Sequence, residues 1–419
     1  MTTSPQFRQP WEPLYAAVAT GMRIYSDCAF RVVVFGRERL RARRHVLLVS
    51  THRSDADVPI ICGRLYFADR MYLRRGPRLH FAARDDLFES GALGGLLPAQ
   101  APLWLRRILY GFDPAPYMPR VRVNPIRSAV AMRAVQALRF APDAPLARSL
   151  PKSLVAEILR HAQAAGLPVP ATAADADRPE LAGVIWTEIE RDQLPDARGL
   201  WRARAQAATG DLRRLIDLHA RGEPLLLFPE GTPSPHGAIG PLRPGLGLIV
   251  RRSRPRAILP LAVAYDPLTT GRPFAFLTVG EPFPPPRRDV EKAVLDVLRR
   301  TVPLTCAQVV SHRLLVEEGL RADTLAPAEL DRWLAAAVER AHEDGRAVDP
   351  SLRSPSTRRK RLSDCLLALA GAGLVEVPEA NVLVLNRERI RADRAVRRAA
   401  LEFASSQMKL EEALAIPDT

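Results

Sequence analysis

The chain has 419 residues, 47% of them hydrophobic, so it is long enough for two domains with sizeable cores. Its 61 Lys and Arg outnumber 46 Asp and Glu, and the net charge of +15 favours partners that carry phosphate, such as anionic lipid surfaces, nucleic acid or phosphorylated substrates. No run reaches the ~18–20 consecutive apolar residues that span a bilayer, and the N-terminus lacks a signal-peptide pattern. The four cysteines show no disulfide or metal spacing and fit a reducing cytoplasm: Cys28, Cys62, Cys306 and Cys365.

Residues 1–30 are expected to form an N-terminal amphipathic helix. Their apolar side chains recur at helical spacing: Trp11, Leu14, Tyr15, Val18, Met22 and Tyr25. A stripe of this kind either lies in a lipid interface or packs on a sheet, and both interpretations stay open.

Two predicted strands follow at 30–35 and 46–49, and the second leads into the polar run His52-Arg-Ser-Asp-Ala-Asp57. A buried strand that breaks into polar residues is where open α/β sheets place their ligands. His52 can act as a general base near neutral pH, and a carboxylate on its second ring nitrogen would fix the tautomer. Positions i and i+5 lie ~140° apart on a helix, so we expect His52 in the loop and Asp57 in the first turn of the next helix.

A looser pattern comes next. Val121-Arg-Val-Asn-Pro-Ile-Arg127 predicts a strand that ends in an arginine, and residues 128–140 predict a helix. An insertion at about 141–205 is rich in Pro, Ala and Asp, with helical patterns at 152–165 and from about 199. It could form a lid, the wall of a substrate site or a surface elaboration.

A second junction between strand and loop lies at Leu225-Leu-Leu-Phe228, which runs into Pro-Glu-Gly-Thr-Pro-Ser234. Both junctions would open onto one crevice if their strands end at the same edge of a sheet.

Taken together, these runs resemble the sequence blocks of the glycerolipid acyltransferases, the superfamily of lysophosphatidate and glycerol-3-phosphate acyltransferases. The resemblance covers roughly residues 10–285 and is most specific in the His-x4-Asp block at 52–57 and in Phe-Pro-Glu-Gly-Thr-x-Ser at 228–234. Residues 121–127 are similar to the second block, 242–245 stand where the family has Phe-Lys-x-Gly, and 258–263 resemble the fourth block.

The resemblance implies an α/β fold, a mostly parallel sheet flanked by helices. A helical insertion and a small α+β C-terminal extension are expected in addition to it. It also implies an O-acyltransferase of phospholipid biosynthesis that moves a fatty acyl group from acyl-CoA or acyl-carrier protein to a hydroxyl of a glycerol phosphate or lysophosphatidate. No metal or other cofactor is expected, and the enzyme would be cytoplasmic and peripheral at the inner face of the membrane.

By the same resemblance, His52 is the general base and Asp57 orients it. The expected substrate-binding residues are Arg127, Glu230, Gly231, Thr232, Ser234 and Arg243. Pro233 departs from the family, because most relatives have an arginine at that position of the block. The proline removes a cation and a backbone donor, for which Arg53 or Arg243 could compensate.

The last residues, 301–419, lie outside the resemblance. Pro327 opens a predicted helix that ends at Gly345, and another covers 358–371. Strands at 374–377 and 382–385 and an arginine-rich helix at 387–415 resemble a winged-helix module.

Three rival functions stay open. A nucleic-acid-binding or regulatory protein would use the basic C-terminal module, with Arg358-Arg-Lys-Arg361 and the arginines at 387–398 on phosphates. A nucleotide-sugar transferase would hold a metal with Asp55 and Asp57. A non-catalytic binder of lipid phosphates would have no need of His52. The domain organisation that we expect is an N-terminal helix at 1–30, an acyltransferase domain at 31–300 and an extension at 301–419.

Overall fold

The computed structural model describes residues 12–40, 45–67, 78–95, 97, 101–194, 196–234, 236–316, 324–376 and 382–407. The chain divides into two compact units. Unit 1 comprises Met1–Ala16 and His80–Leu218, and unit 2 comprises Ala17–Leu79 and His219–Thr419. The predicted boundary at residue 300 therefore does not coincide with a boundary between units.

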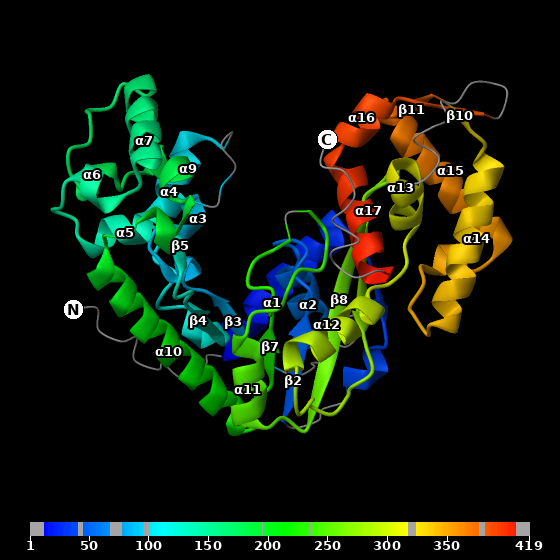
Figure 1. Cartoon of the computed structure of the whole chain (residues 1–419), viewed down its shortest axis with the longest axis horizontal. Helices are drawn as coiled ribbons and strands as arrows, with labels where there is room; N and C mark the ends of the chain where they lie inside the picture. The colour runs from blue at the N-terminus through cyan, green and yellow to red at the C-terminus, as the bar shows by residue number, and fades with distance from the viewer. Residues whose placement is uncertain are drawn as a thin grey trace. The chain divides into compact units, whose positions relative to one another are not determined.

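The fold is α/β, as predicted, with a mixed, mostly parallel sheet of seven strands flanked by helices (Figure 1). Five of these strands lie in unit 2, in the order β1 (Arg31–Phe35), β9 (Phe274–Val279), β8 (Ala257–Asp266), β2 (Val46–Ser50) and β7 (Leu225–Leu227). Strand β2 runs parallel to both β8 and β7, whereas β8 and β9 are antiparallel.

The register of β2 and β7 positions the predicted motifs. Every residue of β2 is buried, as expected of an apolar strand with a neighbour on each side. Val49 pairs with Leu227, so the two strands end side by side and the loops that follow them leave the same edge of the sheet. The expectation that both junctions share one edge is confirmed.

Three helices of unit 2 are α2 (Asp57–Tyr66), α11 (Gly245–Ser253) and α12 (Val290–Thr301). Helix α1 (Glu12–Ala29) begins in unit 1 and continues into unit 2. Trp11 lies outside the described residues. The buried face of α1 carries Tyr15, Ala19, Arg23 and Ser26, and Tyr25 is 50% exposed, so the predicted apolar stripe shares only Tyr15 with the face that packs. The reason is a close approach: a Cβ on Gly63 of α2 would lie 2.8 Å from the Cα of Arg23.

In unit 1, β3 (His80–Arg84) pairs in parallel with β4 (Val123–Ile126), and β5 (Ala131–Arg133) pairs antiparallel with β6 (Glu188–Glu190). The predicted helix at 128–140 is wrong at its start. Residues 131–133 form strand β5, which pairs with β6, and only α5 (Ala134–Phe140) is helical.

The helical patterns of the insertion are confirmed by α7 (Lys152–Ala164) and α10 (Arg198–Ala220). The shorter helices of unit 1 are α3 (Ala92–Gly95), α4 (Leu103–Tyr110), α6 (Leu146–Ser149), α8 (Ala173–Ala176) and α9 (Ala182–Ile185). The insertion forms a core with α5, in which Leu138, Ile158 and Ile185 are fully buried.

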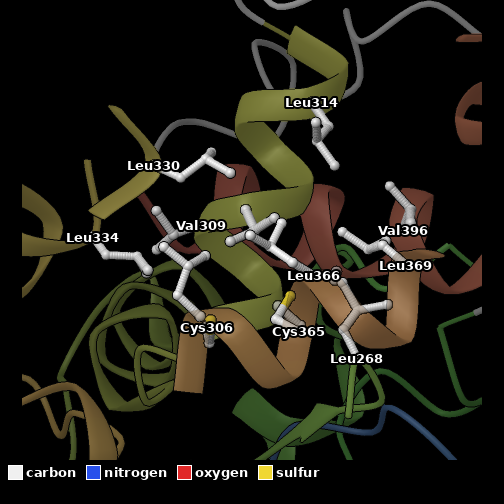
Figure 2. Packing of buried hydrophobic residues seen from close by; sticks show 14 of the residues in the cluster. Leu268, Cys306, Val309, Leu314, Leu330, Leu334, Cys365, Leu366, Leu369 and Val396 are labelled. Atoms are coloured by element: carbon white, nitrogen blue, oxygen red, sulfur yellow. The ribbon is translucent and has the colours of Figure 1, made fainter. Parts of the chain in front are cut away.

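The C-terminal part of unit 2 contains α13 (Cys306–Val316), α14 (Pro327–Glu343), α15 (Pro355–Gly371), α16 (Arg387–Ala392) and α17 (Arg394–Gln407). Strands β10 (Thr324–Leu325), β12 (Leu383–Leu385) and β11 (Val375–Glu376) form a small antiparallel sheet in that order. Figure 2 shows the apolar core in which these helices meet, with Val309, Leu334, Leu369 and Val396 among its members.

The long arginine-rich helix predicted at 387–415 is in fact two helices. The chain breaks at Asp393, whose carboxylate accepts a hydrogen bond from the backbone N–H of Val396 at 2.9 Å and so begins a new helix. Residues 408–415 of that prediction lie outside the described residues. Gly345 has φ +65° and follows the end of α14, as predicted.

A buried ion pair joins the C-terminal helices to the sheet. Arg361 of α15 donates from Nη2 to Asp266 at the end of β8, at 2.6 Å, and also to the Leu268 carbonyl at 2.9 Å. Asp266 is fully buried and burial raises its pKa, while the Arg361 guanidinium opposes that rise. Within the described ranges, none of the helices combines the length and the apolar character that crossing a bilayer requires.

We expect Arg361→Met to lower the free energy of unfolding by about 3–5 kcal/mol at pH 7, because it leaves the Asp266 carboxylate buried without a counter-charge. The pKa of Asp266 would rise further in the folded variant, so the deficit should shrink as the pH falls toward the unfolded-state value of about 3.9 and the carboxyl becomes neutral. Urea denaturation across this pH range measures it. A small deficit that does not change with pH would contradict the structural role of the pair, and Arg361→Met with Asp266→Asn should recover part of the loss.

Candidate active site

The His-x4-Asp motif forms a dyad at the end of β2. His52 lies in the loop and Asp57 is the first residue of α2, as predicted. The His52 Nδ1 atom is 3.1 Å from Asp57 Oδ2. An ionised carboxylate only accepts, so Nδ1 carries the proton and Nε2 is left as the basic nitrogen. The His52 side chain is 13% exposed, and its ring lies 4.4 Å from that of Phe228 between centroids.

Asp57 is fully buried and completely engaged. Its Oδ2 accepts from the backbone N–H groups of Arg53 and Ser54 as well as from the His52 ring. Its Oδ1 accepts from the Tyr265 hydroxyl at 2.6 Å. These donors hold the carboxylate in place, and the carboxylate in turn holds the imidazole in one orientation.

Tyr265 is a site residue that the sequence did not reveal. It lies near the end of β8, two residues beyond the apolar run at 258–263 that resembles the fourth block. Burial raises its pKa well above the usual value, and the Asp57 carboxylate raises it further, so the hydroxyl stays protonated and donates. The only local signal was a tyrosine on an otherwise apolar strand that ends at the candidate site.

Glu230 joins the two motifs. Its Oε1 accepts from the backbone N–H of His52 at 2.9 Å, and its Oε2 accepts from that of Gly240 at 3.1 Å. The backbone N–H of Ser234 donates to the His52 carbonyl at 2.9 Å, which adds a second link between the loops. The structure thus brings Asp57, Glu230 and Ser234 together around His52.

Gly231 and Arg243 lie side by side. Gly231 has φ +82°, a conformation that glycine adopts without strain, and a Cβ there would lie 3.3 Å from Arg243 Nε. The backbone N–H of Arg243 donates to the Pro229 carbonyl at 2.8 Å. The Arg243 side chain is exposed, so a cation stands beside the glycine of the motif; Thr232 and Ser234 are partly exposed.

Arg53 cannot supply the charge that Pro233 removes. Its side chain is only 1% exposed, and it donates from Nη1 to the Gly237 carbonyl at 2.7 Å, inside the protein. Of the two arginines expected to compensate for Pro233, Arg243 alone is placed at the surface of the motif.

Arg127 belongs to unit 1 and follows β4 directly, as predicted. Its Nη1 lies 2.9 Å from each carboxylate oxygen of Asp211, a partner that the sequence did not indicate. Burial raises the pKa of Asp211, and Arg127 counteracts that shift. Arg122 instead adopts φ +62° and contacts the His80 ring at 3.0 Å.

The metal-binding alternative finds no support in this loop. Asp55 is exposed while Asp57 is buried and saturated with donors, so the two carboxylates do not converge. Among the described residues there is no group of three or more His, Cys, Asp or Glu placed to hold a metal ion.

Comparison with known proteins adds little to this geometry. No family model and no curated protein matches the chain. Among solved structures, it is similar to the crystal structure of the 1-acyl-sn-glycerophosphate (LPA) acyltransferase PlsC from Thermotoga maritima, with 16% identity over 68% of this chain and 78% of that chain and a TM-score of 0.33. Similarity at that TM-score carries no argument about fold or activity.

We expect Glu230→Ala to destabilise the protein by about 2–4 kcal/mol, because two backbone N–H groups lose their acceptor. Amide exchange should quicken at His52 and Gly240 in particular. Urea denaturation and hydrogen exchange read by mass spectrometry measure the two effects. Asp55→Ala, which removes an exposed carboxylate from the neighbouring loop, is the matched control and should change stability by less than about 0.5 kcal/mol. Equal effects of the two substitutions would contradict the bridging role of Glu230.

Proposed function

We propose that this protein is a glycerolipid O-acyltransferase, which moves a fatty acyl group from an acyl-CoA or acyl-carrier-protein thioester to a hydroxyl of a glycerol phosphate or lysophosphatidate. The observation that carries the proposal is the ordered dyad of His52 and Asp57, linked through Glu230 to a loop that presents Gly231 and Arg243. A base for a hydroxyl and a cation for a phosphate are what this reaction requires of a protein.

In this mechanism, His52 Nε2 removes the proton of the acceptor hydroxyl as its oxygen attacks the thioester carbonyl. The C–O bond forms, the tetrahedral intermediate collapses, and the C–S bond breaks. The imidazolium then returns its proton to the departing thiolate, and Asp57 stabilises the positive charge in between. A thioester is already activated, so the reaction needs no acyl-enzyme and no redox or metal cofactor.

Phosphate binding falls to the second loop. Arg243 would pair with the phosphate of the acceptor, Gly231 would let it approach the backbone, and Thr232 and Ser234 would offer hydroxyls. Glu230, with each carboxylate oxygen on a backbone N–H, acts in this proposal by aligning the two loops. Arg127 is also proposed as a phosphate ligand, and the phosphate would compete with the Asp211 carboxylate for its guanidinium group.

A membrane surface is the proposed place of action, at the inner face and in the cytoplasm. The chain carries a net charge of +15, which anionic lipid attracts. On α4, Trp104 and Ile108 are each 64% exposed, and large exposed apolar side chains of this kind suit a lipid interface.

Nucleic-acid binding is a weaker candidate because the basic run of α15 is occupied within the protein. Arg358 and Arg359 both pair with Asp331, at 2.7 and 3.1 Å, and Arg361 is buried against Asp266. These guanidinium groups would have to leave their carboxylates to reach a phosphate backbone.

The function is tested by thiol release from a long-chain acyl-CoA, with glycerol 3-phosphate, with 1-acylglycerol 3-phosphate and with no acceptor, in the presence of anionic vesicles. We expect release to depend on one of the acceptors, and His52→Ala to slow it by ~10²-fold or more because the base is lost. His161→Ala, an exposed histidine of unit 1, is the control and should be unaffected. Normal turnover by His52→Ala would overturn the proposal. So would the absence of thiol release with both acceptors, when acyl-CoA and then an acyl-carrier-protein donor are supplied.

Arg243→Ala should raise the KM for the phosphate-bearing acceptor by roughly 10-fold or more, the cost of one charge-assisted contact of about 1.5–3 kcal/mol. The KM for the acyl donor should change much less. Arg252→Ala removes another exposed arginine, on α11, and should leave both constants unchanged. An effect confined to the donor would mean that this loop binds the thioester instead.

A further inference from the structure

Next to the base, Arg53 is a cation inside the protein. It ranks among the largest fully buried side chains, and its neighbours come from two distant parts of the sequence. Its Nη1 donates to the Gly237 carbonyl at 2.7 Å, and its Nε lies 3.8 Å from Oε1 of Glu402 on α17. Glu402 is itself buried, with its side chain 5% exposed. Burial raises the pKa of Glu402 to about 7, and the guanidinium of Arg53 opposes that rise, so the two groups are electrostatic partners inside the protein.

Helix α17 also contacts the loop that follows the second motif. The backbone N–H of Ile239 donates to Ser405 Oγ at 3.1 Å. Gly237 has φ +83°, and a Cβ there would lie 2.4 Å from the Arg398 carbonyl oxygen, so the loop and the helix backbone touch at a point where only glycine fits.

These contacts lead to the dyad by two short routes. The backbone N–H of Arg53 donates to Asp57 Oδ2, the oxygen that faces the His52 ring. Gly240, next to Ile239, donates to Glu230, whose other oxygen holds the His52 N–H. A shift of α17 would therefore move both the carboxylate that orients the base and the backbone that carries it.

Helix α17 is fixed from behind by the C-terminal core. It packs along α13 and against α12. Val396, Ala399 and Ala400 of α17 are buried in the same cluster as Leu369 of α15 (Figure 2). Helix α17, which carries Glu402 and Ser405, is thus held by a core built from Leu268 and residues 304–400.

We propose that α17 is a structural part of the catalytic site and that Arg53, Glu402 and Ser405 are positioning residues for the His52 dyad. A buried ion pair contributes little net stability compared with apolar side chains of similar size, so its value here lies in fixing the loop geometry. The inference rests on the proposed acyl transfer for its kinetic readout and on the contacts alone for its structural readout.

The structural readout is amide exchange in the full chain. Glu402→Gln removes the counter-charge of Arg53 with almost no change in volume, and Ser405→Ala removes the acceptor of Ile239. We expect faster exchange at 51–57 for the first variant and at 237–240 for the second, with unit 1 unchanged. Glu388→Gln, an exposed glutamate of α16, is the matched control and should alter neither segment. Unchanged exchange at both segments in both variants would overturn the proposal, whether or not the protein transfers acyl groups.

The kinetic readout separates positioning from stability. Glu402→Gln should lower kcat about tenfold while KM for both substrates stays within about twofold, because the base is misaligned and the binding groups are kept. Replacing both Arg53 and Glu402 by Leu removes the two charges together. The double variant should have a melting temperature close to that of the unmodified protein, while its kcat stays as low as that of Glu402→Gln. If the double variant recovers kcat together with stability, the pair is only structural and the proposal fails.

Discussion

The parallel pairing of β2 with β7 is the constraint on which the candidate site depends. Val49 and Leu227 are partners across the ladder, so the chain leaves both strands at one edge and delivers His52 and Glu230 to the same place. A slip of one residue would turn every side chain of the shifted strand to the opposite face of the sheet. Every residue of β2 and β7 is buried, so the placement of the loops depends on the packing of the core.

Two buried carboxylates, Asp57 and Glu230, fix the positions of the loops that follow β2 and β7. Asp57 accepts hydrogen bonds from its own loop, from the His52 ring and from Tyr265. Glu230 accepts one from the His52 N–H of the first motif and one from the Gly240 N–H of the loop that follows the second motif. A buried carboxylate that lost a partner would carry a desolvation cost of several kcal/mol, so each of these bonds is strongly favoured once the others exist. These hydrogen bonds fix the loops at the candidate site, although most of their residues belong to no helix or strand.

Local patterns in the sequence were enough to predict the strands at the site and the positions of His52 and Asp57, because continuous apolar runs that end in polar residues act over a few neighbours. They failed at 131–133, whose helical pattern is overridden by pairing with β6 more than 50 residues away. They also missed Tyr265, Asp211 and Glu402. Each of these residues matters through a partner on another element, and nothing in its immediate neighbourhood announces that partner.

The contacts of α17 with the two loops, such as that of Arg398 with Gly237, bear on the order in which the chain folds during synthesis. Arg53 leaves the ribosome about 350 residues before Glu402, and the loop at 237–240 precedes Ser405 by more than 160. The loops that carry His52 and Glu230 therefore acquire their final neighbours only when α17 arrives. Contacts so distant in sequence form slowly, so we expect the candidate site to be completed late in folding.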